Sequence, residues 1–488
     1  MKTQRTSNSR VLHWEVILFM ALYILLPSYF ALELSQSLPL ITASRILIAL
    51  MGVILLIRRR DVFSFKSFRI RNLNLTLTQD PFLRTSLLIY WGLLLLVNAT
   101  FLFKTTESVK QIFVIIAEEY LVVWMLCLII DTREKLISAL RIMVFSAAAV
   151  AVIAAIGSII NYNPFLLLDT VSRDMVIRPF YRYGVLRACV GFMHPVYYGA
   201  YCAVMLPIGM FFADRSETKR EKLLYSGCLV LILTGLILSN SRGSILAFGC
   251  TACLIFFIRL YRKSLGKLFA TYLPIIGCAV VILALVFALS PAGRPRLAKY
   301  AESVKNFFSS HVEPGPGTDP STPTDPSTSE PSATEPSEPE PDLTPEFGEN
   351  PNGVGSRLDQ LSGIRYTVER QPVFGFGPNA PARGLVGYMY SPGTWSFVKT
   401  VDVNIVAIIS QYGLVGLIGF LCLYGSIGIS FLRKPYRSDP LMHYLFLAFV
   451  CYMLCLLSIS FLDKWFWVIT GLGLCLINII RKEQVVSD

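Results

Sequence analysis

Charged residues are scarce in this chain. Asp, Glu, Lys and Arg make up 16% of its 488 residues, against about 25% in an average soluble domain. Hydrophobic residues make up 54%. So few charges cannot cover a water-exposed surface of this size. The composition therefore excludes a soluble globular protein and predicts an integral membrane protein.

Clusters of metal ligands are also missing. The chain has four histidines, and neither a second cysteine pair nor a histidine cluster accompanies Cys250-x-x-Cys253. None of the eleven cysteines lies in the long segment 291–402, and all fall in or beside hydrophobic runs. This distribution argues against a metal centre and a disulfide framework, and it favours small thiols packed between helices.

Twelve hydrophobic runs are long enough to cross a bilayer, which takes roughly 17–25 helical residues. They lie at 11–32, 38–57, 83–103, 109–130, 136–160, 189–213, 222–241, 243–258, 267–290, 403–431, 441–461 and 464–480. The first run has no small-residue cleavage site, so we expect an anchor and not a removed signal peptide. The fold class predicted is an all-α polytopic membrane protein with about twelve transmembrane helices.

Basic residues decide the predicted orientation. They gather in alternate connections, at 58–71, 133–135, 214–222, 259–263 and 433–437. Because Lys and Arg are retained on the cytoplasmic side, both termini are expected in the cytoplasm and 291–402 outside. These connections account for the net charge of +12, so the bilayer is the expected partner and nucleic acid is not.

The outer segment 291–402 divides into two parts. Residues 312–345 are rich in Pro, Ser, Thr and acidic residues and contain no basic residue, which predicts a disordered insertion. Residues 353–402 contain a predicted helix that Ser356 can cap, that carries Leu361, Ile364 and Val368 at helical spacing, and that Pro372 ends. The chain is therefore divided into 1–290 with nine spans, 291–402 as an outer loop with a small helical unit, and 403–488 with three spans and a cytoplasmic tail.

Several arginines fall outside, against the usual charge bias. Arg187 stands at the mouth of the sixth predicted span, Arg242 stands in a short turn between two spans, and Arg357 and Arg365 share the predicted outer helix. Guanidinium groups bind phosphate oxygens through paired hydrogen bonds. These residues predict an anion site, with helix capping and lipid headgroups as the alternatives. Arg45, near the outer end of the second span, either reaches the interface or is functional.

Polar and aromatic candidates lie beside these arginines. Asp402 stands at the outer end of the tenth predicted span with Asn404 just inside it, at a depth where a carboxylate is costly unless it is solvated or paired. Tyr388 and Trp395 are suited to stacking on sugar rings or to the membrane interface. His194 is either a buried structural residue or a substrate contact. The glycines of VFGFGP at 373–378 allow a turn to approach a ligand closely.

Three segments resemble the O-antigen ligase and Wzy-type polysaccharide polymerase family of membrane glycosyltransferases. The family's arginine-glycine-proline entry to a span is matched by RACVGFMHPVYYG at 187–199, and its SRG turn by SNSRGSILAF at 239–248. Its arginine followed by proline and G-x-G is matched by SRLDQLSGIRYTVERQPVFGFG at 356–377. One position departs from the ligases: their histidine-asparagine pair is replaced by Asp402 and Val403, closer to polymerase-like members.

The resemblance implies transfer of a glycan from undecaprenyl diphosphate to a sugar or other hydroxyl acceptor, on the outer face of a bacterial plasma membrane. No cofactor and no metal is implied. The residues implied in catalysis are Asp402, which accepts or aligns the hydroxyl proton, and Arg242 and Arg357, which stabilise the diphosphate. The residues expected to bind substrate are Arg187, Arg365, His194, Asn404, Trp395 and Tyr388.

Three functions remain open at this point. The first is a polymerase of lipid-linked repeat units for a capsular, extracellular or other surface polysaccharide. The second is a ligase that moves a finished glycan to another acceptor. The third is a polysaccharide flippase or transporter, which the absence of an internal repeat disfavours. A flippase and a chain-length regulator are further candidate partners.

Overall fold

The computed structural model describes residues 16–34, 39–58, 77–171, 180–182, 185–261, 263–290, 355–391, 394–460 and 462–487. The insertion predicted at 312–345 lies outside the described residues. So do the first part of the predicted span 11–32 and most of the basic connection 58–71.

Within the described residues, nine helices are long and apolar enough to cross a membrane. They are α4 (Pro81–Thr100), the continuous segment of α5 (Thr106–Val114), η1 (Ile115–Tyr120) and α6 (Leu121–Ile129), α7 (Arg133–Ile160), α8 (Pro195–Arg215), α9 (Lys219–Leu238), α10 (Arg242–Tyr261), α11 (Leu265–Leu289), α15 (Asn404–Leu432) and α17 (Lys464–Ser487). Three shorter apolar helices occupy the other three predicted spans: Val16–Leu25, α2 (Ala43–Arg58) and α16 (Pro440–Cys455). The helical character is confirmed, with nine candidate membrane spans among the described residues, and the count of twelve spans and the side of the termini stay predictions.

Polar residues start several of these helices. Asp80 and Asp439 each stand before a proline at the first helical position, and their carboxylates accept backbone N–H groups of α4 and α16. Thr132 and Thr218 cap α7 and α9 in the same way. A side-chain oxygen at this position satisfies one of the N–H groups that a helix start leaves unpaired. The caps explain why the helices begin a few residues before the hydrophobic runs.

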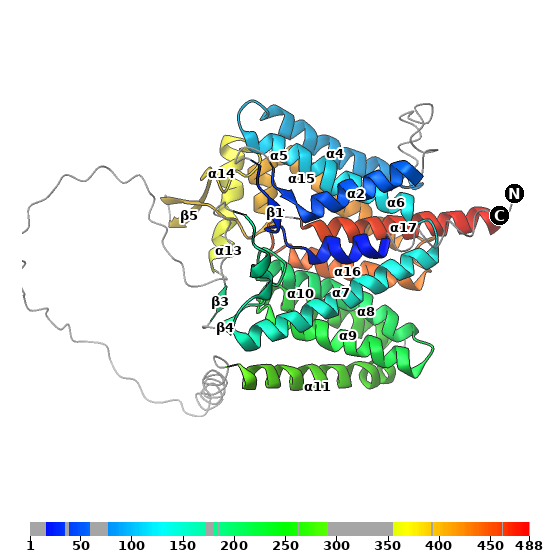
Figure 1. Cartoon of the computed structure of the whole chain (residues 1–488). Helices are drawn as coiled ribbons and strands as arrows, with labels where there is room; N and C mark the ends of the chain where they lie inside the picture. Colours follow the sequence, from blue (N-terminus) through cyan, green and yellow to red (C-terminus); the bar gives the residue numbers. More distant parts are fainter. Residues whose placement is uncertain are drawn as a thin grey trace, which may run out of the picture.

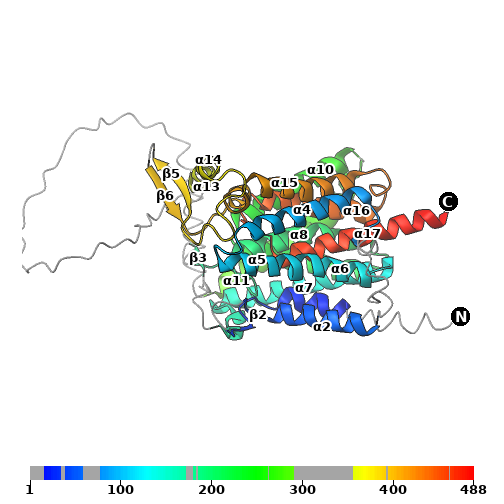
Figure 2. The ribbon, with the colours of Figure 1, turned by 90° about the horizontal axis from the view of Figure 1, so that it is seen from above.

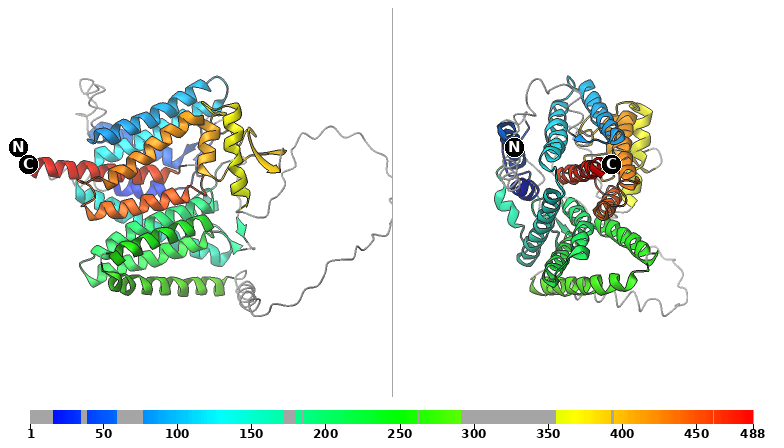
Figure 3. Two further views of the ribbon diagram at one scale, coloured as in Figure 1. Left: turned by 180° about the vertical axis from the view of Figure 1, so that it is seen from behind. Right: turned by 90° about the vertical axis from the view of Figure 1, so that its right-hand side faces the viewer.

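The helices form a bundle in which α8 packs among α7, α9, α10 and α16, and α11 lies at the edge (Figures 1 and 3). Over an apolar stretch of 18 residues in each helix, 89% of the α8 stretch is buried, against 22% for α10 and for α11. A helix that is apolar and exposed on most of its surface is suited to lipid. Cys250 and Cys253 on α10 and Cys278 on α11 are exposed, so these three thiols do not pack between helices as expected.

The remaining elements gather at one end of the bundle, which we call the outer end (Figures 1 and 2). They are the short helices η2 (Pro164–Leu168), α13 (Gly355–Gln360) and α14 (Ser362–Arg370) and the antiparallel pairs β1 (Ala31–Leu32) with β2 (Ile41–Thr42), β3 (Tyr181–Arg182) with β4 (Val185–Leu186), and β5 (Val386–Ser391) with β6 (Thr394–Val398). The C-terminal end of α17 lies at the opposite end (Figure 2). The prediction of a purely helical outer unit is therefore wrong, because a hairpin of two longer strands belongs to it.

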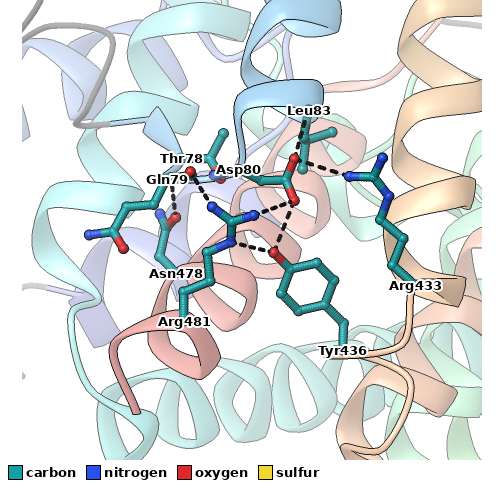
Figure 4. Close-up of polar contacts among 8 residues, drawn as sticks. All are labelled: Thr78, Gln79, Asp80, Leu83, Arg433, Tyr436, Asn478 and Arg481. Carbon is teal, nitrogen blue, oxygen red and sulfur yellow. Dashed lines mark hydrogen bonds and ion pairs between the residues drawn. The ribbon is translucent and has the colours of Figure 1, made fainter. Parts of the chain in front are cut away.

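A buried carboxylate joins three elements at the end opposite the outer end (Figure 4). Asp80 accepts hydrogen bonds from the Tyr436 hydroxyl at 2.9 Å and from the Arg481 guanidinium at 3.1 Å, and Arg433 lies 3.5 Å away. Arg481 also donates to the Tyr436 oxygen at 2.6 Å. A buried charge needs such partners, because desolvation without them is costly. The contacts hold the start of α4, the segment after α15 and the end of α17 together, all of which are predicted cytoplasmic.

A second charged pair lies inside the bundle. The Arg45 guanidinium is 2.5 Å from a Glu118 oxygen, so Arg45 has a partner within the protein. The neighbouring Glu119 is buried and accepts hydrogen bonds from the Tyr90 hydroxyl at 3.3 Å and the Trp91 indole at 3.2 Å. Both carboxylates lie on the π-helical turn η1, and neither is among the candidates that the sequence suggests.

Candidate functional site

The outer unit is built on the face of α14 that packs against the β5–β6 hairpin. The Tyr366 ring lies 4.9 Å from the Trp395 ring and 5.9 Å from the Phe397 ring. A Cβ at Gly387 would lie 3.0 Å from the Tyr366 ring, so only glycine allows this approach without a shift. Tyr388 is half-buried on β5, opposite Ser396. The aromatic candidates therefore lie on one small hairpin.

The helix expected to run from Ser356 to Pro372 is broken into two. α13 ends at Gln360, and α14 begins at Ser362 after a turn at Leu361. Leu361 and Val368 are exposed, whereas Tyr366 and Thr367 are buried. The apolar spacing thus predicts the helical conformation and not the buried face.

The outer unit is fastened to α15 at a break in that helix. Gly413 has φ 63° and ψ −158°, so the helix cannot continue regularly through it. The backbone groups that the break leaves without a partner inside the helix are hydrogen-bonded to the segment 372–377. The bonds run from Phe376 N to Ser410 O at 2.8 Å, Gly377 N to Gln411 O at 3.1 Å, Leu414 N to Pro372 O at 2.9 Å and Val415 N to Val373 O at 3.2 Å. The segment 372–377 therefore supplies hydrogen-bond partners for backbone groups of α15 that the break leaves unpaired within the helix.

The glycines of VFGFGP serve this junction. Gly375 has φ +64°, and a Cβ there would lie 2.7 Å from the Gly413 nitrogen. Gly377 has φ +88°, and a Cβ there would lie 2.8 Å from the Phe101 ring. The close approach that these glycines permit is to α15 and to the end of α4, instead of to a ligand.

Arg357 and Asp402 meet beside this junction. The Arg357 Nε lies 3.9 Å from an Asp402 carboxylate oxygen. Among the residues that the structure describes, no hydrogen-bond partner reaches this buried Nε, whereas 53% of the Asp402 side chain is exposed. A buried charged donor left unpaired costs free energy, and an anion in contact with it would remove that cost. The pair therefore combines an available donor with an accessible carboxylate.

Arg187 and Arg242 lie together at the turn between α9 and α10. The Arg187 Nε donates to the Ser239 carbonyl at 3.2 Å, and the next residue, Ala188, donates its backbone N–H to the Leu238 carbonyl at 3.0 Å. Arg242 is the first residue of α10, and its side chain is exposed. The tight hairpin expected between these two spans is present.

The serines around Arg242 hold the turn in place. Ser241 and Ser244 share a hydrogen bond of 2.9 Å, and Ser239 donates to the Leu236 carbonyl at 2.6 Å. All three hydroxyl groups are buried, and Gly199 of α8 packs against them. They therefore hold the turn that carries the arginine and are not placed to contact an anion themselves.

The segment 456–460 connects the two pairs of residues. Gly243 packs directly on Ser458, so closely that a Cβ would overlap it. Asn404 donates its backbone N–H to the Leu456 carbonyl at 3.2 Å and its side-chain amide to the Ser460 carbonyl at 2.9 Å. Arg242 precedes Gly243, and Asp402 lies two residues before Asn404. One short segment after α16 therefore carries both halves of the candidate site.

Residues 227–421 match the family model described as O-antigen ligase. This segment of the chain is similar to the O-antigen ligase family. The matched segment runs from α9 to α15 and includes Arg242, Arg357 and Asp402, whereas Arg187 precedes it. The family indicates transfer of a lipid-linked glycan by a glycosyltransferase-like membrane enzyme. No curated protein matches the chain with significance.

Two other candidates within this matched segment, Arg365 and Asn404, have structural partners. Arg365 forms an ion pair of 2.6 Å with Glu369 one helical turn away, and 70% of its side chain is exposed. The Asn404 side-chain amide makes two hydrogen bonds: it donates to the Ser460 carbonyl, and it accepts from the Tyr424 hydroxyl at 3.3 Å. Both residues are accounted for by contacts within the protein.

His194 caps α8, just outside that helix. Its Nδ1 accepts the Val196 backbone N–H at 3.2 Å, and its ring meets the Phe180 ring edge to face at 4.5 Å. Burial, with a smaller contribution from the nearby Arg187 cation, lowers the pKa of His194 to about 4. At neutral pH the ring is uncharged, and its geometry accounts for it as a cap.

We expect acid to destabilise the protein through His194. Its pKa is lower in the folded state than the ordinary value of 6.5. The unfolded chain therefore binds more protons, and stability falls as the pH drops from about 6.5 towards 4. Asparagine is also a good cap, so His194→Asn should lose less stability over this range. Unfolding midpoints in detergent between pH 7 and pH 4.5 measure the difference, and parallel curves for both proteins would contradict the expectation.

Two arginines of the outer unit are not among the sequence-based candidates. The Arg370 guanidinium lies 3.9 Å from the centre of the Tyr366 ring and 5.7 Å from that of Trp395. Arg383 donates to the Phe376 carbonyl at 2.5 Å, while its buried Nε has no hydrogen-bond partner in the segments that the structure describes. Arg357 is selected because it is an arginine in the predicted outer segment, and the same criterion would also select Arg370 and Arg383.

No group of three His, Cys, Asp or Glu side chains that could hold a metal ion occurs in the part of the chain that the structure describes. The donors that gather at the candidate site are guanidinium groups, which bind anions and not metal ions. The expectation that this site works without a metal ion stays a prediction.

Proposed function

We propose that this protein polymerises undecaprenyl-diphosphate-linked oligosaccharide units at the outer face of a bacterial plasma membrane, for a capsular, extracellular or other surface polysaccharide. The observation that carries the proposal is the buried Arg357 Nε, which has no hydrogen bond within the described part of the chain and lies 3.9 Å from the accessible Asp402 carboxylate. The pair lies within the segment that matches the O-antigen ligase family model. It supplies the two functions that glycan transfer from a lipid diphosphate needs.

The first function is stabilisation of the leaving group. In the transfer, the acceptor hydroxyl oxygen bonds to the anomeric carbon of the donor sugar, and the bond from that carbon to the diphosphate oxygen breaks. The bonding electrons stay with the lipid diphosphate. The charge that develops there is stabilised by preorganised donors, which are Arg357 and Arg242, with Arg187 as a further phosphate contact. Guanidinium groups would thus do what a divalent metal ion does in other glycosyltransferases.

The second function is removal of the hydroxyl proton. Asp402 is the acceptor of this proton, or aligns the hydroxyl through a hydrogen bond. More than half of its side chain is exposed, so an incoming sugar can reach it. Tyr388 and Trp395 on the hairpin are the proposed stacking surfaces for that sugar.

A polymerase is favoured over a ligase by the residue at position 402. Ligases of this family carry a histidine-asparagine pair where this chain has Asp402 and Val403, and residues 353–416 contain no histidine. The ligase reading is kept as the second candidate, because the family model itself is described as O-antigen ligase. In both readings 353–402 is the catalytic part of an outer loop, between membrane parts 1–290 and 403–488 whose termini are cytoplasmic.

Deletion of the gene in its own host tests the proposal. A polymerase predicts that single lipid-linked repeat units accumulate at the outer face and that long surface glycan disappears. Purified protein in nanodiscs, given the lipid extract of the deletion strain, should then produce a ladder of longer lipid-linked glycans, with EDTA present as well as without it.

The other outcomes are distinct. A ligase predicts accumulation of finished, long glycan on the lipid carrier. A flippase predicts single units held at the inner face and no new glycosidic bond in nanodiscs. An unchanged lipid-linked pool together with an inactive purified protein would overturn the proposal of glycan transfer altogether.

A further inference from the structure

The position of Asp402 depends on one buried side chain. The Gln360 side-chain oxygen accepts the backbone N–H of Asp402 at 2.9 Å. Gln360 is 9% exposed, so water cannot readily replace this bond. It is the last residue of α13 and lies three residues after Arg357 on the same helix.

This arrangement links the two members of the candidate pair through one turn of helix. Residues three apart lie on the same face of a helix, so α13 presents both Arg357 and Gln360 to the chain at Asp402. Arg357 lies beside the Asp402 carboxylate, and Gln360 accepts the Asp402 backbone N–H. On the far side, Asn404 is fixed to the segment after α16. Asp402 is therefore held between two anchored points, although its side chain is largely exposed.

We propose that Gln360 is a positioning residue for the transfer reaction. Its hydrogen bond sets the distance between the Asp402 carboxylate, the Arg357 guanidinium and the acceptor hydroxyl. The inference rests on the proposed function, and it adds a residue that contacts neither substrate. Reacting groups must approach to about 3–3.5 Å, and a displacement of about 1 Å costs on the order of 100-fold in rate.

Gln360→Met tests the hydrogen bond directly, because methionine has a similar length and no strong acceptor. We expect kcat to fall roughly 10- to 100-fold, while KM for the lipid extract of the deletion strain changes less than about threefold. A split of this kind separates misplacement of a reacting group from loss of substrate binding.

Ser362→Ala is the matched control. The Ser362 hydroxyl oxygen accepts the Met389 backbone N–H at 2.7 Å, so it also joins a helix of the outer unit to a neighbouring segment. It does not contact Asp402. We expect a similar small loss of stability from both variants, on the order of 1 kcal/mol. Only Gln360→Met should lower kcat, and Ser362→Ala should keep it within about twofold.

Gln360→Glu provides a second readout and covers the case in which the methionine variant does not fold. Glutamate keeps an acceptor oxygen in the same place and adds a negative charge. A second carboxylate disfavours the ionised form of Asp402, so the acid limb of the kcat/KM profile should move up by roughly one pH unit. Above that limb kcat should recover to within about threefold of the parent protein.

The outcomes distinguish this inference from the proposed function. If the unaltered protein shows no turnover, glycan transfer itself is wrong. If it is active and Asp402→Asn is inactive, but Gln360→Met keeps its kcat and Gln360→Glu keeps its pH profile, the positioning role is overturned. Equal losses of kcat in Gln360→Met and Ser362→Ala would overturn it too, because both would then reflect stability alone.

Discussion

Replacement of Asp402 by asparagine or of Arg357 by glutamine should lower kcat for glycan transfer by about 10²–10⁴-fold. Asparagine keeps the size of the side chain but cannot accept a proton. Glutamine keeps a donor at Arg357 but removes the positive charge that a departing diphosphate needs. Both side chains are partly exposed and 3.9 Å apart, and such a pair contributes little to stability. The folded state should therefore survive both changes.

The measurement uses protein in nanodiscs and the lipid extract of the deletion strain, with unfolding midpoints in detergent as the check on folding. Arg437→Gln is the control for the loss of one positive charge, because Arg437 is exposed in the segment between α15 and α16. It should transfer at the parent rate within about twofold. Retention of more than a tenth of the activity by either site variant would exclude the proposed roles.

The helices could be predicted because their cause is local. A run of about twenty apolar residues can satisfy its backbone in a membrane only as a helix or a closed barrel, and caps such as Asp80 and Thr218 mark where helices begin. The arginines at 187, 242 and 357 could be selected because cations are rare outside. The structure brings Arg357 to Asp402, and it joins the Arg242 turn to the same short segment after α16.

Features that depend on distant partners could not be predicted in the same way. The alternation of aromatic residues on either side of Pro392 and Gly393 is typical of a β-hairpin. In the sequence, these aromatic residues are interpreted only as a surface for sugar stacking, and the strands are not predicted. A glycine pattern indicates where the backbone is closely approached, but it does not identify the group that approaches it. Gly375 meets Gly413, which lies 38 residues later in the chain.

Polar residues show the same limit. Asn404 stands next to Asp402 and therefore looks like a site residue, yet its partners are Ser460 and Tyr424. Arg45 looks unpaired in its own hydrophobic run, because Glu118 is supplied by another helix. Whether a polar side chain inside a membrane protein faces a substrate or another helix depends on tertiary contacts that spacing does not encode.

The break in α15 predicts the largest effect on stability. Gly413 has φ 63° and ψ −158°, a combination that is essentially restricted to glycine. A Cβ there would also overlap the Val373 carbonyl. Backbone strain and overpacking each cost about 1–3 kcal/mol, so Gly413→Ala should destabilise the protein by about 2–6 kcal/mol.

The effect should be concentrated in the outer unit, because the segment 372–377 is bonded across this break. A shift at Gly413 weakens those bonds and releases the segment that connects α14 to α15. We therefore expect faster proteolysis within 372–384 and loss of transfer activity at temperatures where the bundle itself is still folded. Gly425→Ala on the same helix is the control, since a Cβ there meets nothing within 4 Å, and alanine there should be neutral or stabilise by up to about 1 kcal/mol. Equal unfolding midpoints and equal proteolysis of the two variants would show that the junction does not hold the outer unit to the span.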